Sequence, residues 1–154
     1  MNDEPRADSF VDTNILVYAF GDNDEARSPV ARALLRDLMT AGRLRTSTQV
    51  LQELFVVLTR KARKLLTAGQ ALRYLDEVAR WPVIASDYGA VRQAAELSGA
   101  ASLSFWDALL VVAAARSGAA LLYTEDLQHG QKILGVEIVN PFRARDCQPR
   151  LADL

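Results

Sequence analysis

Cysteine and histidine are almost absent from this chain. Its 154 residues contain one cysteine, Cys147, and one histidine, His129. A single cysteine excludes an intramolecular disulfide and a cysteine-rich zinc site, and such scarcity fits a reducing compartment. We interpret His129 as a loop residue rather than a catalytic group.

Neither sign of charge predominates, and long hydrophobic runs are also missing. With 18 basic and 19 acidic residues the net charge is -1, so nucleic-acid binding would need a local basic patch. The longest nearly apolar run, 108–115, is too short to span a membrane. The first eight residues are polar, unlike a signal peptide, and are expected to be flexible. We therefore expect a soluble cytoplasmic protein.

Hydrophobic residues make up 50% of the chain, which indicates one globular domain over residues 1–154. Strands are predicted at 10–11, 44–47, 83–85, 119–123 and 137–139, the last as an edge strand. Helices are predicted at 15–20, 29–41, 49–61, 68–80, 88–99 and 105–116. Strands that alternate with helices predict an α/β fold, with a parallel sheet and helices on both of its faces.

Short polar residues mark where several helices begin. Ser28 is predicted to cap the second helix, with Pro29 at its first position. Thr67 and Gln70 have the spacing of a capping box. Ser86 or Asp87 is predicted to cap helix 88–99, and Ser104 precedes the apolar helix 105–116.

Four acids lie near one edge of the predicted sheet. Asp12 and Asp126 follow the first and fourth strands, where the carboxyl ends of parallel strands place ligands. Glu53 borders the apolar face of helix 49–61, and Asp107 is the sole acid of helix 105–116. A carboxylate in such an apolar helix is rarely left without a partner.

Each acid also has an ordinary structural interpretation. Asp12 and Asp126 could cap helices, Glu53 could be solvated, and Asp107 could complete a capping box with Ser104. These explanations are weaker when the four acids are considered together, because converging carboxylates repel one another and raise each other's pKa. A divalent cation relieves that repulsion, and ligands that are all oxygen suit Mg²⁺ or Mn²⁺.

The acids stand in four ordered motifs: Val11-Asp12-Thr13-Asn14, Leu51-Gln52-Glu53-Leu54, Trp106-Asp107-Ala108-Leu109 and Tyr123-Thr124-Glu125-Asp126-Leu127. Over residues 9–142 this order resembles the PIN-domain nucleases, and the small size resembles VapC-type toxins of bacterial toxin–antitoxin pairs. The resemblance implies a three-layer α/β/α sandwich around a parallel sheet of four to five strands. It also implies a Mg²⁺- or Mn²⁺-dependent endoribonuclease that acts on single-stranded or structured RNA, forms a homodimer and is inhibited by a cognate antitoxin.

The resemblance further implies roles for individual residues. The catalytic acids would be Asp12, Glu53, Asp107 and Asp126, and the metal ligands Asp12, Asp107 and Asp126. Thr13, Asn14 and Thr124 match supporting polar positions beside the metal. Glu125 adjoins Asp126, and the sequence leaves open which of the two carboxylates faces the site.

The mechanism implied is attack by a metal-activated water, which leaves a 5′-phosphate and a 3′-hydroxyl. The other ribonuclease route uses the RNA 2′-hydroxyl with paired histidines, and one histidine cannot form that pair. RNA contacts are predicted at the basic run Arg60, Lys61, Arg63 and Lys64, with Arg43 and Arg45 as a second candidate. The dipole of the preceding helix explains the basic run more readily than RNA contact does, although both can hold.

Two other functions remain open. A Mg²⁺-dependent phosphohydrolase of haloacid-dehalogenase type has a second aspartate two residues after the first, where this chain has Asn14. A non-catalytic PIN-like binding module would not need four intact acids.

Overall fold

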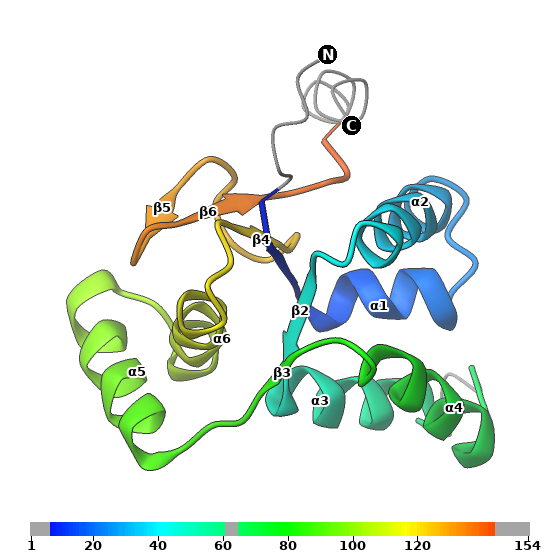
Figure 1. The fold of residues 1–154 in the computed structure, drawn as a ribbon, viewed down its shortest axis with the longest axis horizontal. Helices are drawn as coiled ribbons and strands as arrows, with labels where there is room; N and C mark the ends of the chain where they lie inside the picture. The colour runs from blue at the N-terminus through cyan, green and yellow to red at the C-terminus, as the bar shows by residue number, and fades with distance from the viewer. Residues whose placement is uncertain (1–6, 61–64, 144–154) are drawn as a thin grey trace.

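A six-stranded sheet runs through the molecule in the order β3-β2-β1-β4-β6-β5 (Figure 1). In the computed structural model, residues 7–60 and 65–143 are described. The strands in that part of the chain are β1 (Ser9–Val11), β2 (Leu44–Ser47), β3 (Val83–Ile84), β4 (Leu121–Tyr123), β5 (Lys132–Ile133) and β6 (Val136–Val139). From β3 to β6 every pairing is parallel, whereas β5 pairs antiparallel with β6.

Helices cover both faces of the sheet, which makes the three-layer α/β/α sandwich. Helices α5 and α6 lie on one side, and α1 to α4 lie on the other (Figure 1). Their bounds are α1 (Thr13–Phe20), α2 (Arg27–Thr40), α3 (Thr48–Leu58), α4 (Ala68–Val78), α5 (Tyr88–Ala101) and α6 (Phe105–Arg116). The parallel α/β sandwich is the fold that the sequence predicts.

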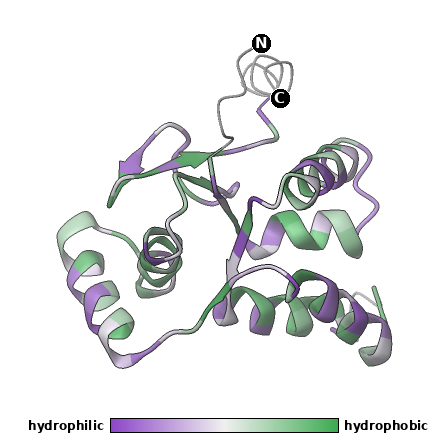
Figure 2. Ribbon diagram, in the orientation of Figure 1, coloured by the Kyte–Doolittle hydropathy of each residue, from purple (hydrophilic) through white to green (hydrophobic). Residues whose placement is uncertain are grey.

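Burial follows the hydrophobic pattern. Every residue of α6 from Ala108 to Ala114 is buried, as expected for a helix that is apolar on all sides. Figure 2 shows the contrast between α1, largely hydrophobic after its first turn, and α5, which alternates between hydrophobic and hydrophilic positions. The strands β1, β4 and β6 supply the centre of the core, including the fully buried Phe10, Leu122 and Ile138.

Three helix starts are confirmed by their hydrogen bonds. Thr67 and Gln70 form the complete capping box of α4. Asp87 accepts from the Ala90 N–H at the start of α5. The Ser104 hydroxyl caps α6, whose bounds agree with the sequence prediction.

The predicted start of α2 is wrong. Ser28 lies inside this helix, and its hydroxyl donates to the Asp22 carbonyl instead of capping the helix. The Asp24 carboxylate accepts from the N–H groups of Ala26 and Arg27, so the helix begins at Arg27, two residues earlier than expected.

Two further details differ from the sequence prediction. Strand β6 is not at the edge, because Leu134 and Gly135 form a tight turn that adds the short antiparallel strand β5. Helix α3 ends at Leu58 rather than near residue 61, since the Thr59 hydroxyl bonds back to the Phe55 carbonyl and the Leu66 N–H bonds to the Leu58 carbonyl.

Among the described residues, no single helix is both long and apolar enough to cross a membrane. Within residues 7–60 and 65–143, α5 and α6 taken together reach that length and composition, and they are bent by 118°. Cys147 and residues 1–6 of the segment expected to be flexible lie outside the described residues.

Candidate active site

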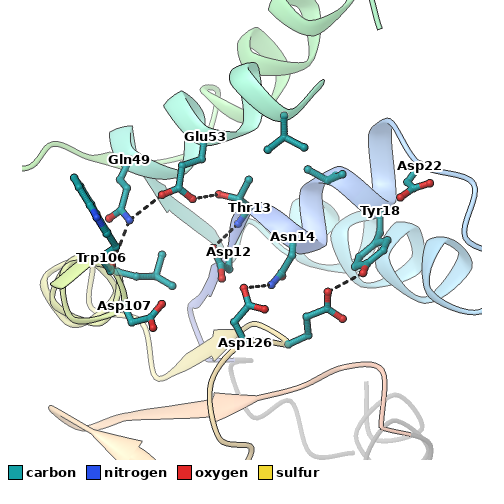
Figure 3. Close-up of a pocket in the computed structure, with 14 residues that line it drawn as sticks. Asp12, Thr13, Asn14, Tyr18, Asp22, Gln49, Glu53, Trp106, Asp107 and Asp126 are labelled. Atoms are coloured by element: carbon teal, nitrogen blue, oxygen red, sulfur yellow. Dashed lines mark hydrogen bonds between the residues drawn. The ribbon is translucent and has the colours of Figure 1, made fainter. Parts of the chain in front are cut away.

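A cleft of about 320 Å³ opens at the carboxyl ends of β1 and β4. All four sequence-predicted acids line it, although they come from four separate segments of the chain. Figure 3 shows Glu53 reaching in from α3, Asp107 from α6, and Asp12 and Asp126 from the loops after the two strands. The structure therefore brings together the carboxylates that the sequence places at this edge.

Asp12 is the most deeply placed acid, with 7% of its surface exposed. One carboxylate oxygen accepts from the Thr13 N–H at 2.6 Å, and the other accepts from the Thr124 hydroxyl at 2.8 Å. Burial raises the pKa of Asp12 from 3.8 to about 6. The two hydrogen bonds oppose that rise, whereas the charges of Asp126 and Glu53 add to it.

Glu53 occupies the exposed side of α3 at the mouth of the cleft. Its two carboxylate oxygens accept from different elements: Thr13 Oγ1 donates at 3.0 Å and Gln49 Nε2 at 3.1 Å. Ser47 fixes the start of the helix by accepting from the Val50 N–H. The carboxylate of Glu53 is thus held by α1 and by the first turn of its own helix.

Asp107 lies in the first turn of α6, half-buried. Its N–H donates to the Ser104 hydroxyl at 3.1 Å, which is one half of a capping box. No described residue donates a hydrogen bond to the Asp107 carboxylate, which lines the cleft instead of completing the box. A carboxylate without protein donors, beside other carboxylates, is available to a cation.

Asp126 and Glu125 face different partners. Asn14 Nδ2 donates to Asp126 at 3.0 Å, whereas Glu125 accepts from the Tyr18 hydroxyl at 2.7 Å and from Arg27 Nε at 3.1 Å. Partial burial raises the pKa of Asp126, the Asn14 bond opposes the rise, and nearby acids including Asp107 add to it. The geometry favours Asp126 as the carboxylate of the site, since Glu125 is already neutralised by Arg27.

The Tyr18 hydroxyl, which donates to Glu125, also has a raised pKa. Burial first, and then the hydrogen bond to Glu125, raises the pKa of Tyr18 to about 12. Arg27 also lies over the rings of Tyr18 and Phe142, at 5.7 and 5.8 Å from their centroids. Glu125 therefore belongs to a closed cluster at one end of the cleft.

The predicted supporting residues connect the acids. Thr13 bonds Glu53, Thr124 bonds Asp12, and Asn14 bonds Asp126. The carbonyl oxygen of the Asn14 side chain is buried and has no hydrogen-bond partner among the described residues. Such an orphaned acceptor in a site of carboxylates is a further oxygen for a cation.

The predicted basic residues separate into three groups. Arg60 is exposed just beyond α3 and lines a hollow beside the cleft. Lys61, Arg63 and Lys64 lie outside the described residues. The second candidate lies away from the cleft, because Arg43 and Arg45 flank the start of β2, at the opposite end of the sheet, and both form ion pairs with Asp8.

Gln49 and Trp106 are among the cleft residues to which the sequence analysis assigned no role. Gln49 is 7% exposed and donates to the Trp106 carbonyl at 3.3 Å as well as to Glu53. Trp106 also lines the cleft and is 61% exposed. In the sequence, only their positions point to the cleft: Gln49 lies one helical turn before Glu53, and Trp106 directly precedes Asp107.

The oxygen ligands fit Mg²⁺ or Mn²⁺ better than a metal that prefers nitrogen or sulfur. Among the described residues, no three carboxylate, imidazole or thiolate side chains are grouped to hold one ion together. Mg²⁺ itself needs only one or two protein carboxylates and keeps waters or substrate phosphates as its other ligands. Asp12, Asp107, Asp126 and the side-chain carbonyl of Asn14 are the oxygens near the cleft that could contribute such ligands.

The sequence matches the family model described as PIN domain over residues 9–132. No curated protein sequence matches the chain.

Three solved structures share the fold. A toxin–antitoxin complex from Klebsiella pneumoniae has a TM-score of 0.65 and 19% identity, over 86% of this chain and 97% of that chain. The Mycobacterium tuberculosis VapC20, a sarcin–ricin loop cleaving toxin, has a TM-score of 0.57 and 23% identity, over 77% and 89%. Rickettsia felis VapBC2 bound to a promoter DNA fragment has a TM-score of 0.60 and 20% identity, over 86% and 97%.

Proposed function

The chain belongs to the PIN-domain family, and on that premise we propose that it is a Mg²⁺- or Mn²⁺-dependent endoribonuclease of the VapC toxin type. One observation carries the proposal: Asp12, Glu53, Asp107 and Asp126 converge in one cleft from four separate elements. The substrate class is RNA, single-stranded or structured, because a toxin of this fold is described as cleaving the sarcin–ricin loop.

In this proposal Asp12, Asp107 and Asp126 would hold the divalent cation. Bound there, it would supply a water of lowered pKa and would offset the negative charge of the scissile phosphate. Thr13 and Thr124 orient the Asp12 carboxylate through hydrogen bonds to its two oxygens. Glu53, held at the cleft mouth, accepts the proton of the attacking water on a carboxylate oxygen. Attack in line leaves a 5′-phosphate and a 3′-hydroxyl.

The geometry of the cleft supports neither of the two alternative functions. A phosphohydrolase of haloacid-dehalogenase type needs an acid two residues after Asp12, whereas Asn14 occupies that position and donates to Asp126. A binding module without activity leaves the raised pKa of Asp12 and the grouping of four acids without a purpose.

The proposed partner is a cognate antitoxin, since related structures are toxin–antitoxin complexes. Four acids make the cleft negative, and a guanidinium can bond a carboxylate through two parallel hydrogen bonds. We expect an arginine of the antitoxin to enter the cleft in competition with the cation. Replacing that arginine with alanine should restore cleavage at least partly while the pair stays associated. The toxin itself is proposed to act in the cytoplasm as a homodimer.

Cleavage of a labelled single-stranded RNA tests the proposal. The protein should cut the RNA with Mn²⁺ or Mg²⁺ and lose activity in EDTA. Asp12→Asn should be inactive with an unchanged circular dichroism spectrum, because the substitution removes charge and keeps shape. Products that carry a 2′,3′-cyclic phosphate would exclude the proposed mechanism.

A further inference from the structure

A second hollow, here called the α3 groove, adjoins the acidic cleft. Its volume is about 490 Å³, and it is lined by Gln52, Val56 and Arg60 together with Glu53 and Trp106. Glu53 and Trp106 line the acidic cleft as well. The two hollows therefore lie side by side, and a ligand longer than the acidic cleft would reach the α3 groove.

Trp106 presents a large aromatic surface at this junction. Its side chain is unusually open for a tryptophan, with 61% of the residue exposed. It is nevertheless held in place, because the Phe105 ring packs edge-on against the indole, with 5.2 Å between the ring centroids and an interplanar angle of 77°. Gln49 also fixes its backbone through the Trp106 carbonyl. Figure 3 shows the indole beside Gln49, at the margin of the acid cluster. A preset ring loses little freedom on binding.

Arg60 supplies positive charge at the far end of the α3 groove. Glu53, Val56 and Arg60 follow one another at helical spacing along one side of α3 and its C-terminal end. Arg60 is exposed and forms no ion pair with any residue that the structure describes. Arg27, near the cleft, is by contrast paired with Glu125 and Asp24. Arg60 is thus the cation of this wall that remains available to a phosphate.

We propose that the α3 groove binds an unpaired nucleotide of the RNA next to the scissile bond, with its base stacked on Trp106 and a phosphate at Arg60. The inference rests on the proposed function and adds to it a requirement for an unpaired base. A base inside a duplex is already stacked on both faces, so the indole can stack only on a base that is out of the helix. Because every base has a π-face, this contact tolerates different sequences.

RNA binding measured without cleavage tests the inference. The protein carries Asp12→Asn, and the probe is a fluorescein-labelled single-stranded hexaadenylate RNA followed by fluorescence anisotropy. Adding Trp106→Ala should raise Kd roughly 10- to 100-fold, whereas Trp106→Phe should retain most of the binding. Arg60→Ala should weaken binding and reduce the salt dependence by about one phosphate contact. Tyr88→Ala is the matched control, because Tyr88 is an aromatic residue of α5 with 77% exposure outside both hollows.

Intrinsic fluorescence gives a second readout. The chain has two tryptophans, so Trp81→Phe leaves Trp106 as the sole reporter. Unlabelled hexaadenylate should quench its emission, and a duplex of the same length should quench it much less.

The outcomes separate the inference from the proposed function. If the wild type neither binds nor cleaves RNA, the proposed function fails. If it cleaves RNA while Trp106→Ala leaves Kd unchanged and no quenching occurs, the nucleotide site is overturned and the nuclease remains. Loss of antitoxin binding alone in Trp106→Ala would also overturn it, since the indole would then be a protein contact.

Discussion

The hydroxyl of Thr124 donates a 2.8 Å hydrogen bond to the carboxylate of Asp12, although the two residues lie 112 positions apart in the chain. The bond joins the ends of the adjacent strands β1 and β4. It is buried, and it opposes the rise in the pKa of Asp12 that burial causes. The same oxygen of Thr124 accepts from the Asp126 N–H at 3.1 Å. One hydroxyl thus orients two of the four acids.

Thr124→Val should therefore destabilise the protein. The substitution keeps the shape of the fully buried side chain and leaves the Asp12 carboxylate without this donor. We expect the free energy of unfolding in urea to fall by about 1–3 kcal/mol. Thr46→Val is the matched control, because Thr46 is also fully buried and its hydroxyl has no partner among the described residues. Equal losses in both variants would show that the Thr124 bond contributes nothing specific.

Asp12 should make the stability of the metal-free protein depend on pH. Its pKa is about 6 in the folded protein against 3.8 ordinarily, so folding favours the protonated form. This contribution is fully present below pH 3.8 and is lost as the pH rises through 6. In EDTA, Asp12→Asn should raise the free energy of unfolding at pH 8 by about 3 kcal/mol and change it little near pH 4. A variant less stable than the wild type at pH 8 would contradict the assignment.

The two adjacent acids Glu125 and Asp126 should behave differently. Asp126→Asn should lower RNA cleavage by about 100-fold or more, because it removes a carboxylate from the cleft. Glu125→Gln should leave the cleavage rate close to wild type and cost about 0.5–1 kcal/mol of stability, through its partly exposed ion pair with Arg27. The reverse order of activities would place Glu125 in the site.

The sequence alone could not show which of Glu125 and Asp126 belongs to the site. Both residues are acids after the same strand, so no pattern along the chain distinguishes them. The contacts that do so come from Tyr18 and Arg27, on helices about a hundred residues earlier in the chain. Helix α6, by contrast, was predictable to the residue, since its cap, its apolar run and its end are all local signals.

The misplaced elements have equally physical reasons. Ser28 and Asp24 can both cap a helix, and the sequence could not show that the Ser28 hydroxyl is taken by the Asp22 carbonyl. Strand β5 has two residues, too few for an alternating pattern, and exists because β6 supplies a partner. Its turn also lacks the usual signal, since Leu134 occupies a position that favours Asn or Gly.

That turn predicts a stabilising substitution. Leu134 has φ 50° and 46% exposure, so it holds a left-handed backbone conformation while nearly half of the residue stays in contact with solvent. Leu134→Asn should raise the free energy of unfolding by about 1 kcal/mol, because Asn tolerates this conformation. Leu134→Ala should bring no comparable gain, as it removes the side chain and keeps the unfavourable conformation. If Ala stabilises as much as Asn, the exposed side chain rather than the backbone is the source of the strain.

Thermal unfolding with and without Mg²⁺ or Mn²⁺ tests most directly whether the acidic cleft binds a divalent cation through Asp12, Asp107 and Asp126. At ten times the dissociation constant the cation should raise the Tm of the wild type by about 3–6 °C. Glu96→Gln, which removes an exposed acid of α5 outside the cleft, should show the same shift. Asp107→Asn should lose most of it. No shift in the wild type, or an equal shift in Asp107→Asn, would contradict the site.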